Sequence, residues 1–198
     1  MNSFSNIILI VCIGSVLTNE PITYVNTKSS DGILTHYYPP KYYIKLQNPS
    51  HFEYTDGSNR IFVQVPGLVL SFHHQTPMLY EINFHGECRI DSQQSWLFLR
   101  IRVDGNLIMG NTLVPNMAND TLVDGTSLHS NANTPGAAFP CSKIDWIYLS
   151  AGTHVVDVVA RLANSGRIAG GSLKIKLTQF DSANDINLPI MTPQTRAA

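Results

Sequence analysis

Residues 96–103 read Trp-Leu-Phe-Leu-Arg-Ile-Arg-Val, and Asp104-Gly105 follows them directly. The odd-numbered residues from 97 to 103 are all aliphatic, and they alternate with Phe98 and two arginines. Successive side chains of a β-strand point to opposite faces, so this pattern predicts a strand whose odd-numbered side chains enter a core. An Asp-Gly pair between β-prone runs favours a tight hairpin, because both central residues of such a turn need positive φ. The stretch therefore predicts an antiparallel hairpin.

Similar alternation recurs in the chain from about residue 51 to residue 181. Met78–Phe84 and Leu173–Leu177 alternate cleanly, while Pro66-Gly67 interrupts residues 60–72 and predicts a strand pair or a bulged strand. Residues 111–142 are rich in turn residues and predict a long loop, with the β pattern resuming at Ile144. No window of a dozen residues shows helical periodicity without Gly or Pro. We therefore predict an all-β domain, an antiparallel β-sandwich whose sheets each have one wet face.

The composition restricts the class of protein. A chain of 198 residues suits one well-buried domain, and 43% apolar with only 14% charged residues excludes the signature of disorder. The formal net charge is −1 and no basic run occurs. Binding to nucleic acid needs positive charge to neutralise phosphates, so we expect no nucleic-acid partner.

The first 18 residues predict a secretory signal peptide. Residues 7–13 form an unbroken apolar run that is too short to span a bilayer, and small residues follow it. No Lys or Arg precedes the run, which leaves a buried N-terminal strand as the alternative. We expect export, cleavage between Ser15 and Asn19, and no membrane span.

Segments on either side of the predicted sandwich (51–181) have a different character. Residues 19–50 are rich in Thr, Ser, Pro and Tyr and predict an extended N-terminal arm. Within this arm, Tyr37–Tyr43 contains two prolines and favours either a polyproline-like arm or an edge segment. Its tyrosines either pack over the domain or form an aromatic surface for a partner. Residues 182–198 lack periodicity and predict a flexible tail.

Two cysteines and one acceptor triplet agree with export. Cys12 lies inside the predicted signal, so Cys88 and Cys141 remain as a pair. A disulfide between them would add about 4 kcal/mol in the chain-entropy account, and two buried thiols are the alternative. Asn119-Asp120-Thr121 matches the N-glycosylation pattern and predicts a glycan on Asn119.

Two stretches resemble the jelly-roll heads of the C1q and tumour-necrosis-factor superfamily and of collagen triple helix repeat-containing proteins. The first is Pro77–Phe84, which is followed by Leu97–Val103, a tight turn and a further strand. The second is Ile147–Val158, after which a final strand closes the sheet. The chain departs from the family in lacking a preceding Gly-X-Y stalk and in its cysteine pattern, and Met78-Leu79 replaces a Gly. The resemblance implies jelly-roll topology and a homo-trimer, and it transfers no binding residue.

No pattern of catalytic or metal-ligating residues stands out. Seven histidines occur without His-Glu-x-x-His, Cys-x-x-Cys is absent, and so is Gly-x-Ser-x-Gly. Carboxylates such as Asp145 and Asp157 are scattered singly, and we expect those two on a solvated sheet face. We predict no catalytic residue, no cofactor and no metal.

These observations predict a secreted extracellular binding module that is oligomeric and not an enzyme. Its ligand is an extracellular protein or a glycan. Trp96 and Phe98, on the outward side of their strand, are the candidate interface residues. One alternative is a structural protein of an extracellular matrix, coat or capsid. Another is a lectin or hydrolase with a site in the 111–142 loop around His129.

Overall fold

The computed structural model describes residues 27–28, 34–35, 38–54, 61–91, 95–110, 112–116, 127–130, 136–162, 165–179 and 189–193. The chain divides into two compact units, Met1–Tyr37 and Tyr38–Ala198. In the first unit, β1 (Thr27–Lys28) and β2 (Leu34–Thr35) pair in antiparallel fashion. The predicted signal peptide of residues 1–18 lies outside the described residues.

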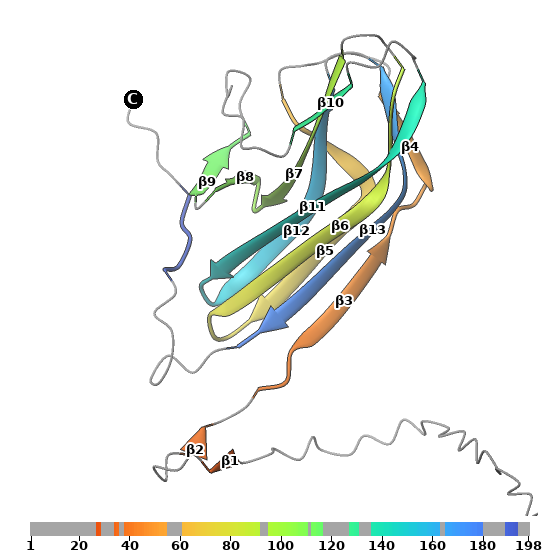
Figure 1. Cartoon of the computed structure of the whole chain (residues 1–198). Coiled ribbons are helices and arrows are strands. Elements are labelled where there is room, and N and C mark those ends of the chain that lie inside the picture. Colours follow the sequence, from red (N-terminus) through yellow and green to blue (C-terminus); the bar gives the residue numbers. More distant parts are fainter. Residues whose placement is uncertain are drawn as a thin grey trace, which may run out of the picture. The chain divides into compact units, whose positions relative to one another are not determined.

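The second unit is a sandwich of two antiparallel sheets, and its described residues include no helix (Figure 1). The sheet that we call the β13 sheet has the order β11 (Ala137–Leu149), β6 (Met78–Ile90) and β13 (Gly166–Thr178). Both β3 (Lys41–Leu46) and β4 (His51–Tyr54) pair with the far side of β13. The β12 sheet has the order β5 (Val63–His74), β12 (Gly152–Leu162), β7 (Ser95–Val103), β8 (Asn106–Met109) and β9 (Thr112–Pro115), and β10 (Ser127–Ser130) pairs with β7.

The strand pairing is nested in the manner of a jelly roll. β3 pairs with β13, β5 with β12, β6 with β11 and β7 with β10, so the first strand meets the last and the innermost two meet each other. These four strand pairs fall alternately in the two sheets: the first and third lie in the β13 sheet, and the second and fourth lie in the β12 sheet. This is the double Greek-key arrangement of a jelly roll. The β8–β9 hairpin is an addition between β7 and β10. The predicted all-β jelly-roll sandwich is confirmed.

The alternating stretch of residues 96–103 lies in the centre of the β12 sheet. Its odd-numbered residues, Leu97 to Val103, are at most 1% exposed and belong to the main core between the sheets. The following turn has φ of 50° at Asp104 and 83° at Gly105, as the Asp-Gly pair predicts. The predicted hairpin is therefore confirmed.

The opposite side of the same strand is not the wet face that the alternation predicted. Phe98 and Arg100 are buried, and Phe98 joins Phe62, Leu107, Val114 and Val159 in a second, smaller apolar cluster. Residues of the β8–β9 hairpin contribute to this cluster. The Asn116 side chain holds it closed by accepting from Phe62 N–H and donating to Phe62 O, at 2.9 and 2.8 Å.

The predicted loop of residues 111–142 was too long. β9 and β10 lie within this range, and β11 begins at Ala137 rather than at Ile144. The predicted start of β11 was too late because Pro140, a residue that usually interrupts strands, lies inside it. An edge strand tolerates proline, since one of its sides makes no ladder hydrogen bonds, and β11 pairs in the described part of the chain with β6 alone.

Around Pro66-Gly67 the chain forms one bulged strand, the second of the two predicted alternatives. The pairing of β5 with β12 shifts register in this region. Gly67 has φ of +77°, and a Cβ there would lie 2.5 Å from the backbone of Asn48. Only glycine fits at this approach.

The boundaries of the sandwich differ from the predicted ones at both ends. Within the arm predicted for residues 19–50, Lys41–Leu46 is an edge strand of the sandwich. In the tail predicted for residues 182–198, the Met191 N–H donates to Tyr148 O and Pro193 bridges to Leu113. Both segments therefore make contacts with the sheets.

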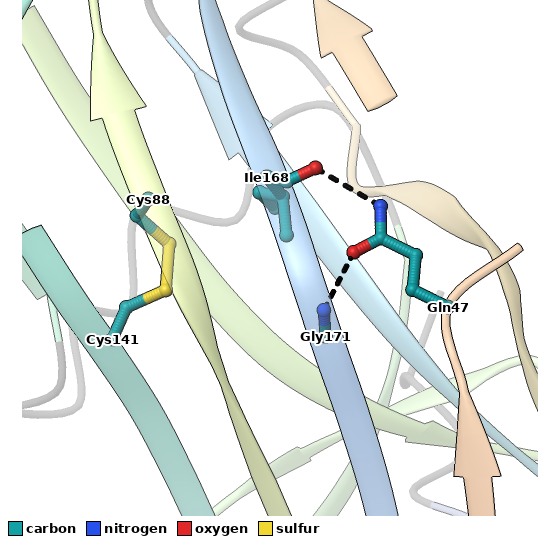
Figure 2. The surroundings of a disulfide bond; sticks show 5 residues. All are labelled: Gln47, Cys88, Cys141, Ile168 and Gly171. Carbon is teal, nitrogen blue, oxygen red and sulfur yellow. Dashed lines mark hydrogen bonds between the residues drawn. A yellow bond between two sulfur atoms is a disulfide. The ribbon is translucent and has the colours of Figure 1, made fainter. Parts of the chain in front are cut away.

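Two features tie the β13 sheet together (Figure 2). The predicted disulfide between Cys88 on β6 and Cys141 on β11 is present and buried. On the other side of the sheet, buried Gln47 bridges the bulge in β13 by donating to Ile168 O and accepting from Gly171 N–H, both at 2.9 Å. Backbone groups that a bulge frees from the ladder are thus satisfied by this side chain.

Candidate functional site

The disulfide fixes which side of β11 faces the core. Cys141, Ile147 and Leu149 all belong to the main core, so the odd-numbered residues of β11 point inward. Lys143 and Asp145 consequently point inward as well, and Lys143 Nζ lies 2.8 Å from Asp145 Oδ1. The predicted solvated position of Asp145 is wrong: its side chain is only 13% exposed.

The middle of β11, residues 143–146, is therefore amphipathic in the inverse sense. Its charged side chains point inward, while Ile144 and Trp146 point outward and are 42% and 58% exposed. A shift of one residue would exchange the two faces, because the side-chain period of a strand is two. Such a shift would break the Cys88–Cys141 geometry. The fold holds Ile144 and Trp146 at the surface.

The other edge of the β13 sheet repeats this exposure. Residues that stand opposite each other in an antiparallel pair share one face. Tyr42 stands opposite Lys176, and Ile44 stands opposite Lys174. Tyr42, Ile44 and Leu46 are all more than 60% exposed. Tyr43 points the other way and packs edge-on against Phe72, with ring centroids 4.9 Å apart.

Between the two apolar edges runs a polar strip on β6 and β13. The pairing places Trp146, Glu81, Lys176 and Tyr42 in one row across four strands. Lys176 Nζ lies 3.3 Å from Glu81 Oε2. In the next row, the Oδ1 atom of Asn83 is buried and has no hydrogen-bond partner among the described residues.

We call this surface the outer β13 face. Its members are two apolar edges and a polar centre: Ile144 and Trp146; Tyr42, Ile44 and Leu46; and Glu81, Asn83, Lys174 and Lys176. Monomeric proteins seldom group large exposed apolar side chains, and such groups rimmed or divided by polar residues mark interaction surfaces. The arrangement is suited to binding a macromolecule.

The two residues predicted for an interface lie on the opposite sheet. Trp96 is 46% exposed and stacks on Phe98 with ring centroids 6.2 Å apart. Phe98 is only 8% exposed, because the second cluster surrounds it. Arg161 lies 4.9 Å from the Phe98 ring centroid. The structure therefore places Phe98 in packing within the chain.

Three further sequence predictions concern Asn119, the loop around His129 and the environment of Asp157. Asn119 lies outside the described residues, as do residues 117–126 and 131–135 of the predicted loop, and the side chain of His129 is not described. Among the described residues, no group of three or more metal-ligating side chains comes together. The expected solvated position of Asp157 is wrong, since it is 4% exposed and accepts from Arg102 Nε at 3.0 Å.

Most of the outer β13 face was missed in the sequence. The signal that could have found it combines the disulfide with the alternation of side chains along a strand. If the disulfide turns Cys141 toward the core, then Trp146, five residues later, must point outward. For the β3 edge, one predicted alternative was an aromatic partner surface at Tyr37–Tyr43. This stretch overlaps with the outer β13 face at Tyr42.

No family model matches this chain, and no curated protein matches it. Solved structures match at low identity. The T13 viral particle of IBDV gives a TM-score of 0.42 at 12% identity, over 72% of this chain and 32% of that chain. The VP2 subviral particle of infectious bursal disease virus gives 0.39 at 10% identity, over 72% and 34%. Eiger TNF from S. frugiperda gives 0.38 at 12% identity, over 75% and 99%.

The chain thus spans about a third of the length of the virus chains. TM-scores this low carry no argument about family or role, so the topology rests on the strand pairing and the superfamily resemblance stays a prediction. Within the described residues, no helix is long and apolar enough to cross a membrane.

Proposed function

We propose that this protein is a secreted, non-catalytic binding module that associates with further copies of itself through the outer β13 face. The observation that carries the proposal is the inverse amphipathicity of β11. Lys143 and Asp145 are turned inward while Ile144 and Trp146 are exposed. Contact with a partner would remove these apolar side chains from water, at a gain of about 25 cal/mol per Å².

A second copy is the partner that this surface fits. Each apolar edge is flanked by the charged strip of Glu81, Lys174 and Lys176, so one copy offers both apolar groups and both signs of charge. In a closed ring, the β11 edge of one subunit would contact the β3 edge of the next, so every subunit would use the same two edges. We propose a trimer, the assembly that the superfamily resemblance implies.

Export supports the same role. A buried disulfide that pins the register of β11 is useful in an oxidising compartment, where disulfides form and persist. We propose that residues 1–18 direct export. Expression in a secreting cell tests this: the protein should be recovered from the medium without its first residues, and retention inside the cell would contradict it.

Sedimentation velocity at tens of micromolar tests the association. The native protein should sediment as a small closed oligomer, and Trp146→Ser combined with Ile44→Ser should convert it to a monomer. Trp96→Ser is the matched control, because Trp96 is an exposed aromatic residue on the other sheet. A native monomer, or loss of association in the control alone, would overturn the proposal.

The same measurement separates the alternatives. Large polymers that grow with concentration would indicate a structural coat or matrix protein. Glycan binding that Trp146→Ser abolishes, without any self-association, would indicate a lectin.

A further inference from the structure

A polar cluster closes one end of the main core, where turns join β5 to β6, β7 to β8 and β11 to β12. His74, Tyr80 and His154 are buried between the two sheets, and Asp104 lies in the β7–β8 turn. The His74 and His154 rings have centroids 5.2 Å apart, and Tyr80 lies near both. No member belongs to the outer β13 face, so a role for this cluster does not depend on the proposed function.

The ring of His154 meets an acceptor at each nitrogen. Its Nδ1 lies 2.7 Å from Asp104 Oδ2, and its Nε2 lies 2.9 Å from Ser150 O. His154 thus links the β7–β8 turn to the β11–β12 turn. Asp104 Oδ1 also accepts from Val155 N–H at 2.8 Å.

The hydrogen bonds of His74 define its tautomer. Its Nδ1 lies 2.7 Å from Thr76 O and must donate, whereas its Nε2 lies 2.8 Å from the Tyr80 hydroxyl. A neutral ring with its proton on Nδ1 satisfies both bonds, because Nε2 then accepts from Tyr80. His74 thus ties the β5–β6 turn to the buried tyrosine.

The groups that face His74 determine how well its ring can hold a positive charge. They are His154 on β12, Tyr80 on β6, His73 on β5 itself, Asp104 beyond His154, and Tyr43 on β3 beyond Tyr80. Asp104 is the one carboxylate that the described part of the chain brings to this cluster, and His154 already engages it. Burial lowers the pKa of His74 below its ordinary value of 6.5, and the charges of His154 and His73 lower it further, against the bond to Thr76.

We propose that His74 and His154 form an acid-sensitive latch that holds the three turns together at neutral pH and releases them in acid. A proton added to Nε2 of His74 removes the acceptor for the Tyr80 hydroxyl. It also places a positive charge on a buried ring whose centroid lies 5.2 Å from that of His154, while Asp104 is already bonded to His154. The hydrogen bonds that join the turns then compete with the cost of this buried charge.

The direction of the pH effect is set by linkage. The folded state holds His74 neutral at a pH where the unfolded chain, with an ordinary histidine, already binds a proton. The stability that His74 contributes is therefore full above about pH 6.5, and it falls as the pH drops from there through the lowered pKa of folded His74.

Nitrogen-15 NMR of the histidine rings in the full chain tests the protonation states. At pH 7.5, the His74 ring should show a proton on Nδ1 only, as its bonds to Thr76 O and the Tyr80 hydroxyl require. A charged His74, or a proton on Nε2 alone at this pH, would overturn the proposal, even if every variant unfolded as expected.

Thermal unfolding at pH 7.5 and pH 5.0 tests the consequence. The unfolding midpoint of the native protein should fall between the two pH values, and His74→Gln should reduce this fall by more than about 2 °C. His85→Gln removes an exposed histidine and is the matched control, with the same fall as the native protein. An equal fall in His74→Gln and the native protein would overturn the latch.

Amide hydrogen exchange locates the release. Protection of the Asp104 and Val155 amides, which face each other at the turn, should decrease in acid more than protection of the Gly171 amide at the far bulge. Equal changes at the three amides would contradict a local latch.

Discussion

The two sheets of this sandwich treat their outer faces differently. The outer side of the β12 sheet buries Phe98, Leu107 and Val159 in a second cluster. The β8–β9 hairpin contributes to this cluster, and Asn116 closes it through two hydrogen bonds to Phe62. The outer side of the β13 sheet leaves Trp146 and Tyr42 exposed. One sheet therefore satisfies its apolar surface within the chain. The other sheet leaves large apolar side chains exposed, which is where an interaction surface is expected.

The largest test of this contrast is to truncate the covered face. Phe98→Ala should lower the free energy of unfolding by about 3 kcal/mol or more, because it leaves a cavity in a closed cluster. Trp146→Ala on the outer β13 face should change the free energy of unfolding of the dissociated monomer by no more than about 0.5 kcal/mol. Urea unfolding of the two variants at a protein concentration too low for self-association measures both values. Equal losses would remove the distinction between the faces.

The second test is to remove the disulfide that fixes which side of β11 belongs to the outer β13 face. Replacing Cys88 and Cys141 together by Ala should lower the free energy of unfolding by about 2–4 kcal/mol, as for loops of this length. It should also weaken self-association, because β11 loses the constraint on its register. Urea unfolding and sedimentation measure the two effects. A stability equal to that of the native protein would show that packing alone holds β11.

A third test concerns the bridge over the β13 bulge. Gln47→Ala leaves Ile168 O and Gly171 N–H without their side-chain partners in a buried place, which should lower the free energy of unfolding by about 1–3 kcal/mol. Chemical denaturation measures the loss. A change below about 0.5 kcal/mol would mean that water replaces the amide.

The smallest effect is expected at the centre of the open face. The Lys176–Glu81 pair has side chains 35% and 40% exposed, and such pairs contribute about 0–1 kcal/mol. A double-mutant cycle with Lys176→Ala and Glu81→Ala should give a coupling at the low end of this range in the monomer. A coupling energy well above this range in the monomer would show that the Lys176–Glu81 pair contributes to the stability of the fold.

The parts of the fold that the sequence predicted are those set by neighbouring residues. Leu97 to Val103 alternate without interruption and end in Asp-Gly, so both the strand and its turn are determined by local geometry. The outward side of that strand was misjudged because Phe98 is covered by the β8–β9 hairpin and the segment around Asn116, which lie elsewhere in the chain.

The outer β13 face depends still more on contacts between residues that lie far apart in the sequence. Along β11, Lys143 and Asp145 have the composition of a solvated side, and only the pairing of Cys141 with a cysteine 53 residues earlier shows that they point inward. The β3 edge is exposed because β13 covers just one of its sides. The latch also needs three turns that the sequence separates widely. Patterns of local alternation carry none of this information.

The nested strand pairing has a consequence for biosynthesis. β13 lies in the middle of its sheet, between β6 on one side and β3 and β4 on the other, although it is the last strand of the ribbon. A ribosome delivers residues 41–54 and 78–90 long before residues 166–178. The nascent chain must therefore leave β3, β4 and one edge of β6 unpaired until the final strand emerges, and contacts so remote in sequence make folding slow.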